Sequence, residues 1–165
     1  MIVTARIDED NLARFTLLRR KHFLLDSNRL PAHLTMFHRL PGEHVDKIIG
    51  SLWVSTRSKG TIQAWVSGIR HLGSGVAFSI ESPQLSGIRA ALRKNVVQWL
   101  GSQDMRTWQP HITVQNNASR AEAYSLYRDL SASFHPHDIK IVGIDLWRYL
   151  DGAWAAEATI TLTDL

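Results

Sequence analysis

Hydrophobic positions recur along this chain with two periods, and these periods predict helices interleaved with strands. Residues 1–7 are typical of a strand, and residues 9–22 carry apolar positions at near-helical spacing behind Asp8 or Asp10 as a cap. After Pro41-Gly42, one stripe fits the spacing of an amphipathic helix: Val45, Ile48, Ile49, Leu52 and Trp53.

Turn signals divide the rest of the chain. Gly73-Ser74-Gly75 separates two strand-like runs and predicts a hairpin over residues 61–81. Asp151-Gly152 is a stronger hairpin signal, within residues 138–163. The segment between these hairpins predicts a helix over 85–99, a strand over 109–115, and a second helix that starts at the capping box of Ser119 and Glu122.

Two of the strand-like runs carry the same short pattern just after a proline. The first run, residues 31–39, contains His33-Leu34-Thr35, and the second contains His111-Ile112-Thr113. Side chains of a strand alternate between its two faces, so each histidine shares a face with its threonine while the aliphatic residue points to the core. The polar pairs are therefore predicted to face outward, into a cleft.

The two pairs suit acid–base chemistry. An imidazole exchanges a proton near pH 7, and a threonine hydroxyl hydrogen-bonds a phosphoryl or carbonyl oxygen. Two facing pairs would supply a base, an acid and two oxygen-binding hydroxyls. The alternative is a pair of strand-surface histidines without chemistry, and the matched context of the motifs favours the catalytic interpretation. The motifs are nearly equivalent, so the pattern does not assign base and acid.

The order of predicted elements repeats along the chain. Each half gives a helix, a motif strand, a helix and a hairpin, which predicts a duplicated α+β unit. We expect one domain over residues 1–165, with pseudo-symmetric halves of roughly 1–81 and 82–165. A rough two-fold relation between the halves would bring the two motifs face to face.

Composition indicates the kind of partner and excludes several classes. With 44% hydrophobic and 21% charged residues, the chain is typical of a soluble globular protein, and its net charge of +4 favours an anionic partner. The absence of cysteine excludes disulfides and thiolate chemistry and is compatible with a reducing cytoplasm. Early charge argues against a secretory signal, and no apolar run approaches the roughly 18 residues of a membrane span. A cytoplasmic protein without membrane association is predicted.

Other site chemistries find little support. The chain has neither an H-E-x-x-H pattern nor a cysteine pair, and the glycines near 68–75 lack the Lys-Ser or Lys-Thr of a phosphate loop. We therefore predict no metal and no cofactor. His38 is expected on the opposite face of its strand from His33, in a structural or solvated role, and His44, His135 and His137 receive no catalytic assignment.

The paired motifs in this frame resemble the 2H phosphoesterase superfamily, and most nearly its bacterial 2'-5' RNA ligase-like branch. The segments Pro31–Gly42 and Leu146–Gly152 also resemble that branch. The resemblance implies a bilobed fold with two antiparallel sheets flanking a central cleft and helices outside. It further implies a metal-independent cyclic phosphodiesterase that opens 2',3'-cyclic phosphates at RNA or nucleotide ends, with reversible 2'-5' RNA ligation. Separately, we expect a monomer.

Under this resemblance, His33 and His111 would serve as base and acid, with Thr35 and Thr113 on the non-bridging oxygens of the phosphate. Arg148, on the strand face opposite its aromatic neighbours, is the candidate for offsetting charge in the transition state, unless it is simply exposed on a hairpin edge. Phe37 is the candidate for stacking on a base, with a place in the core as the alternative. A second hypothesis for the whole protein is a module that binds RNA ends or nucleotides in the same basic cleft without turnover.

Overall fold

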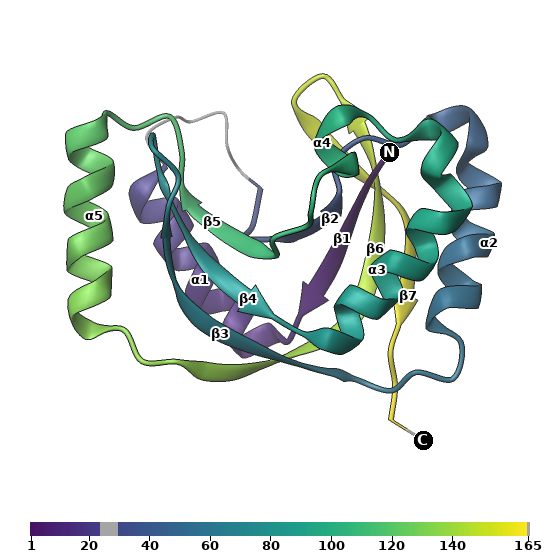
Figure 1. Ribbon diagram of the computed structural model, residues 1–165, viewed down its shortest axis with the longest axis horizontal. Coiled ribbons are helices and arrows are strands. Elements are labelled where there is room, and N and C mark those ends of the chain that lie inside the picture. The colour runs from purple at the N-terminus through teal and green to yellow at the C-terminus, as the bar shows by residue number, and fades with distance from the viewer. Residues whose placement is uncertain (24–29, 165) are drawn as a thin grey trace.

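The computed structural model describes residues 1–23 and 30–164 and shows helices interleaved with strands (Figure 1). The first part of the chain forms β1 (Ile2–Ile7), α1 (Glu9–His22), β2 (Leu34–Phe37), a 3₁₀ turn η1 (Gly42–His44), α2 (Val45–Thr56), β3 (Ile62–His71) and β4 (Val76–Glu81). The second part forms α3 (Pro83–Val96), a 3₁₀ turn η2 (Val97–Trp99), α4 (Ser102–Met105), β5 (His111–Gln115), α5 (Arg120–Ser133), β6 (His137–Leu150) and β7 (Ala153–Thr161). The predicted order of helix, motif strand, helix and hairpin is present in both parts.

Local sequence signals set where several of these elements begin and turn. Asp8, and not Asp10, caps α1 by accepting a hydrogen bond from a backbone N–H of the first turn. Ser119 and Glu122 form the predicted capping box at the start of α5. The hairpin of β6 and β7 turns at Asp151 and Gly152, whose φ angles of 48° and 94° are left-handed values that aspartate and glycine adopt more readily than most residues.

The strands form one antiparallel arrangement in the described part of the chain, so the expectation of two separate sheets is corrected. Their order is β1-β2-β5-β4-β3-β6-β7, and β1 also pairs with β6, which closes the strands from β1 to β6 into a ring. The physical reason is the length of β6, because residues 137–141 pair with β3 and residues 141–147 pair with β1. One strand thus joins what would otherwise be two sheets.

Strand pairing also crosses between the two parts of the chain. The β3–β4 hairpin pairs through β4 with β5, and the β6–β7 hairpin pairs through β6 with β1. Figure 1 shows α5 at one end of the molecule and α2 with α3 at the other. The division into pseudo-symmetric halves of 1–81 and 82–165 stays a prediction.

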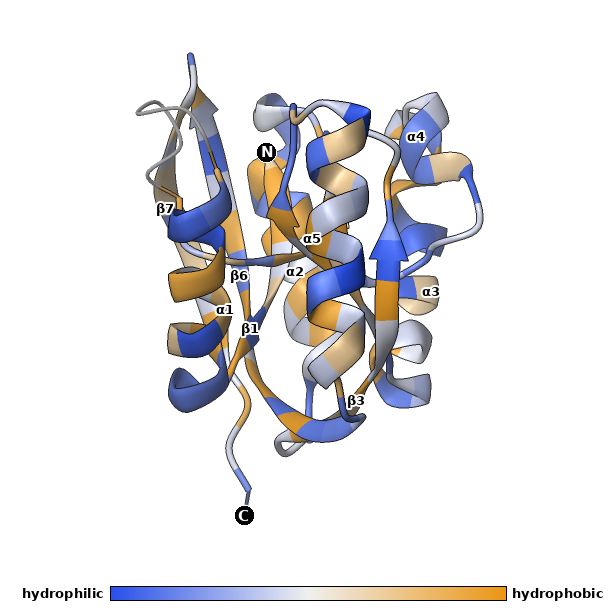
Figure 2. Cartoon of the chain, turned by 90° about the vertical axis from the view of Figure 1, so that its left-hand side faces the viewer, coloured by the Kyte–Doolittle hydropathy of each residue, from blue (hydrophilic) through white to orange (hydrophobic). Residues whose placement is uncertain are grey.

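The core fixes which face of each motif strand remains open. Leu34 and Met36 of β2, and Ile112 and Val114 of β5, are fully buried, as the alternation predicts. Figure 2 shows hydrophobic positions following the strands while hydrophilic positions follow much of the outer surface of the helices. The alternate positions of β2 and β5 are consequently held at the surface of this core.

Candidate active site

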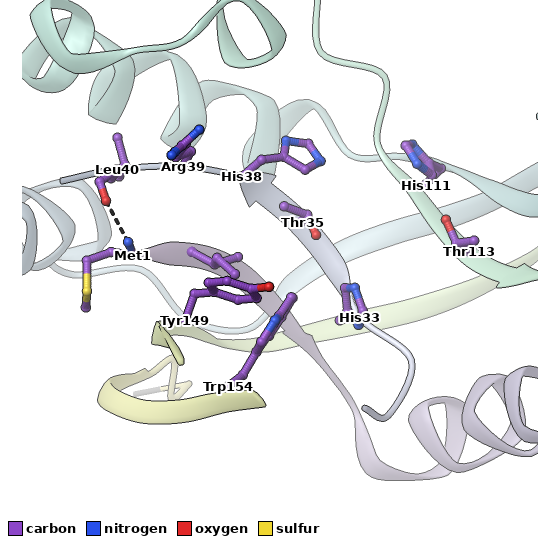
Figure 3. A pocket seen from close by; sticks show the side chains of 11 residues that line it. Met1, His33, Thr35, His38, Arg39, Leu40, His111, Thr113, Tyr149 and Trp154 are labelled. Atoms are coloured by element: carbon purple, nitrogen blue, oxygen red, sulfur yellow. Dashed lines mark hydrogen bonds between the residues drawn. The ribbon is translucent and has the colours of Figure 1, made fainter. Parts of the chain in front are cut away.

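The paired motifs lie on two strands that meet side by side. Leu34 of β2 and Ile112 of β5 are register partners, so the histidines and threonines that flank them lie close together. A cavity of about 720 Å³ is lined by all four predicted residues (Figure 3): His33, Thr35, His111 and Thr113. The structure therefore brings the two motifs to one site.

Each motif histidine is oriented by the same local hydrogen bond. His33 Nδ1 lies 2.9 Å from the carbonyl oxygen of Pro31, and His111 Nδ1 lies 2.7 Å from that of Gln109. A carbonyl oxygen only accepts, so each Nδ1 carries the hydrogen and donates it. The nitrogen that remains for proton exchange is Nε2 in both rings. His137 makes the same local bond to His135 outside the cavity, so position, and not the bond alone, distinguishes the motif histidines.

The two threonines are anchored through their backbones. Trp108 Nε1 donates to the carbonyl of Thr35 at 3.1 Å, and Arg19 Nη1 donates to the carbonyl of Thr113 at 3.0 Å. Within residues 1–23 and 30–164, neither threonine hydroxyl has a hydrogen-bond partner. Both hydroxyls thus remain available to a ligand in the cavity.

Enclosure shifts both imidazoles toward the neutral form. Burial lowers the pKa of His33 to about 4, and the positive charges of Arg19 and His38 act in the same direction. Burial also lowers the pKa of His111, again helped by nearby positive charge, here from Arg70 and His38. At neutral pH and without a ligand, both rings are therefore able to accept a proton at Nε2.

Two aromatic side chains complete the cavity. Tyr149 and Trp154 are register partners across the β6–β7 hairpin and both line it (Figure 3). The Trp154 ring lies 4.8 Å from the His33 ring, centroid to centroid, and so contributes to the enclosure of that imidazole. No sequence motif marks this pair as part of a site, although the hairpin signal at Asp151-Gly152 is enough to place the two residues opposite each other.

Arg148 and Phe37, the two other candidates from the sequence, do not line the cavity of the paired motifs. Arg148 is outside the set of residues that line the cavity, and its Nε donates to Glu157 Oε2 at 3.0 Å. It lies on the other face of β6 from Tyr149, so alternation places the aromatic ring, and not the arginine, at the cavity. Phe37 is fully buried, with the Arg89 guanidinium 4.6 Å from its ring centroid, and no base can stack on it.

His38 and Arg39 are functional candidates that the sequence analysis missed. Both line the cavity, whereas His38 was expected to point away from it. Strand β2 ends at Phe37, so the period-two rule stops before residue 38. The side chain of His38 is instead directed by Asp104 of α4, whose Oδ1 lies 2.9 Å from His38 Nδ1. Pro41-Gly42 is the sequence signal that could have indicated that β2 ends before residue 39.

Comparison with known proteins establishes the family. Residues 7–153 match the family model for the 2'-5' RNA ligase superfamily. The chain belongs to the 2'-5' RNA ligase superfamily. The resemblance to 2H phosphoesterases that the paired motifs carry is thereby confirmed. A comparison with curated proteins finds no match.

Solved structures share the fold of this 2'-5' RNA ligase superfamily member at low sequence identity. TT0787 of Thermus thermophilus is 14% identical, with a TM-score of 0.66 over 98% of both chains. E. coli LigT complexed with 3'-AMP is 15% identical, with a TM-score of 0.64 over 99% of this chain and 97% of LigT. A structure described as a phosphoesterase is 15% identical, with a TM-score of 0.61 over 99% of this chain and 98% of its own.

The described residues of this superfamily member define what the site can do. They bring imidazole and hydroxyl groups to one cavity, but no group of three or more His, Cys, Asp or Glu side chains is placed there or elsewhere in 1–23 and 30–164 to hold a metal ion. Across the same residues, no helix combines the length and apolar character needed to cross a membrane. The groups present are those of proton transfer and oxygen binding.

Proposed function

We propose that this protein opens 2',3'-cyclic phosphates at the ends of RNA or of nucleotides, by acid–base catalysis between His33 and His111 and without a metal. The observation that carries this proposal is the matched orientation of the two imidazoles, each with Nδ1 bound to a carbonyl and Nε2 left for the same cavity. Hydrolysis of a cyclic phosphodiester needs one proton removed and another delivered. Membership of the 2'-5' RNA ligase superfamily supports the choice of phosphate chemistry.

The proposed reaction uses the four motif residues. One histidine accepts a proton from water at Nε2 while the water oxygen bonds to phosphorus in line with the departing ribose oxygen. The phosphorus–ribose oxygen bond breaks, and the other histidine delivers its Nε2 proton to that oxygen. Thr35 and Thr113 donate hydrogen bonds to the non-bridging oxygens and hold the phosphate in register. With a 5'-hydroxyl in place of water as the nucleophile and the ribose 3'-oxygen as the leaving group, the same groups would form a 2',5' linkage.

The cavity also suits the rest of a nucleotide. Tyr149 and Trp154 offer aromatic faces on which a base can stack, in the role expected for Phe37 from the sequence. Structures of E. coli LigT, which shares the fold, are complexes with 3'-AMP, NADP+ and ATP. Nucleotide binding by these relatives supports a nucleotide, or the end of an RNA strand, as the ligand of this chain.

Turnover in EDTA tests the proposal directly. The purified protein is incubated with the four 2',3'-cyclic nucleotides and with an oligonucleotide that ends in a cyclic phosphate, and the products are resolved as 2'- or 3'-phosphates. We expect conversion to a phosphomonoester. If the protein binds these compounds but converts none of them, the proposal fails and the binding module is the better description.

The pH dependence of this reaction is expected to be acidic. In the active free protein one of the two imidazoles is protonated at Nε2 and the other is neutral, and burial lowers the pKa of both His33, to about 4, and His111. Raising the pH therefore removes the Nε2 proton that the acid must deliver, so we expect kcat/KM to peak below about pH 6.5 and to fall roughly tenfold per unit above it. Bound phosphate favours the protonated ring, so kcat should persist to higher pH. A kcat/KM that rises from pH 6 to pH 8 would contradict the assignment.

A further inference from the structure

A third imidazole faces the cavity, held by a buried carboxylate. Asp104 is 2% exposed and accepts three hydrogen bonds: from His38 Nδ1 at 2.9 Å, from the backbone N–H of His38 at 3.0 Å, and from that of Arg39 at 3.1 Å. In Figure 3 the His38 ring lies at the end of β2, between Arg39 and His111. Asp104 thus fixes both the ring of His38 and the backbone from which Arg39 projects.

The contacts of Asp104 determine which atom of His38 meets a ligand. Burial raises the pKa of the Asp104 carboxyl, but the hydrogen bonds from His38 and Arg39 outweigh it and leave this pKa below its ordinary value. An ionised carboxylate accepts only, so His38 Nδ1 donates and Nε2 is free. When the His38 ring is protonated, it donates one charge-assisted hydrogen bond to the Asp104 carboxylate from Nδ1 and can donate another to an anion from Nε2.

Arg39 adds a second cationic donor on the same wall. Its side chain is exposed and lines the cavity. Within residues 1–23 and 30–164, no carboxylate lies within ion-pair distance of its guanidinium, in contrast to Arg148, which pairs with Glu157 at 3.0 Å. A cavity of about 720 Å³ extends well beyond a single phosphate group, and Tyr149 lines it together with His38 and Arg39.

We propose that His38 and Arg39 form a second anion subsite, which binds a phosphate of the substrate other than the one held between His33 and His111. This inference rests on the proposed function and narrows its substrate class. The preferred substrate is then a nucleotide with a 5'-phosphate as well as a cyclic phosphate, as at the end of an RNA strand, and not a cyclic mononucleotide with a free 5'-hydroxyl. Asp104 is a positioning residue in this arrangement, because it acts through His38 and Arg39.

A ratio of two rates tests the subsite. The two substrates are 2',3'-cyclic CMP and the same nucleotide with a 5'-phosphate, and the quantity measured is kcat/KM for the second divided by kcat/KM for the first. We expect a wild-type ratio of about ten or more, expressed mainly in KM, and a ratio near one in His38→Gln and in Arg39→Gln. Damage to the fold lowers both rates together and leaves the ratio unchanged, so the ratio reports the subsite alone.

Matched controls lie outside the cavity. His137→Gln removes a histidine with the same local backbone bond as His33, and Arg148→Gln removes an arginine that Glu157 already pairs. Both controls should keep the wild-type ratio. A wild-type ratio near one, or a ratio that stays high in both His38→Gln and Arg39→Gln, overturns the subsite.

A binding measurement separates this inference from the proposed function. Calorimetry compares cytidine 3',5'-bisphosphate with cytidine 3'-phosphate on the wild type and on Arg39→Gln. The subsite is supported if the wild type binds the bisphosphate more tightly than the monophosphate and if Arg39→Gln loses this preference. This result would support the subsite even if the protein turns over no cyclic phosphate and the proposed reaction fails. Equal affinity of the wild type for the two ligands overturns the subsite, whatever the activity.

Discussion

Replacing His33 or His111 by glutamine is expected to lower kcat for opening of a 2',3'-cyclic nucleotide by about a thousandfold. General acid–base catalysis typically contributes a factor of about 10² to 10⁴, and each histidine supplies one of the two proton transfers. Glutamine preserves much of the side-chain volume but cannot exchange a proton at the position of Nε2. Steady-state rates in EDTA measure the loss, and resolving 2'- from 3'-phosphate products shows which ribose oxygen departs.

The control for this prediction is His137→Gln, which should retain wild-type turnover. Its imidazole makes the same backbone bond as the motif histidines but does not line the cavity. The double variant of His33 and His111 should lose little more than either single variant, because two groups that act in one step are not additive. Turnover that survives either single substitution would mean that a contaminant or a different site is responsible.

The largest expected effect on stability is that of Arg89→Met, which should lower the free energy of unfolding by about 3 kcal/mol. Arg89 is buried on α3, and it donates to the carbonyl of Met36 at 2.8 Å and to that of Asp104 at 3.1 Å. Methionine keeps a side chain of similar length but leaves both buried carbonyls without this donor, and each such loss costs about 1–3 kcal/mol. Denaturation by urea, followed by tryptophan fluorescence, measures the change.

Lys94→Met is the matched control for Arg89→Met, because Lys94 is exposed on the same helix. This control should lie within about 0.5 kcal/mol of the wild type. If Arg89→Met were as stable as Lys94→Met, the two carbonyl contacts would not be stabilising.

The sequence predicts most of the local structure because the signals for it are local. The capping box at Ser119 and the turn at Asp151-Gly152 lie where expected, and the apolar faces of both motif strands are buried. The alternation rule also places each motif histidine on the same face as its threonine, and these four residues line one cavity. These features depend on a few neighbouring residues, so one sequence is enough to find them.

The structure departs from the sequence-based expectations where partners distant in the sequence determine the position of a side chain or the pairing of a strand. His38 faces the cavity because Asp104, on another element, holds its ring, and no spacing rule links these two residues. Phe37 shares the predicted polar face of β2, yet Arg89 packs over its ring and it is fully buried. The closure of the strands depends on the pairing of β6 with both β1 and β3, which the length of its apolar run did not reveal.

The closed ring of strands also determines the width of the cavity. Strands β2 and β5, which carry the two motifs, share only the register pair Leu34 and Ile112, so their own ladder does little to fix the gap between the imidazoles. The distance between the two imidazoles is instead determined by the closed ring as a whole, through β1, β6, β3 and β4. A substitution that alters the twist of β6 therefore changes the spacing of the two histidines without contacting either of them. Selection for a wider or narrower ligand can then act on residues far from the cavity.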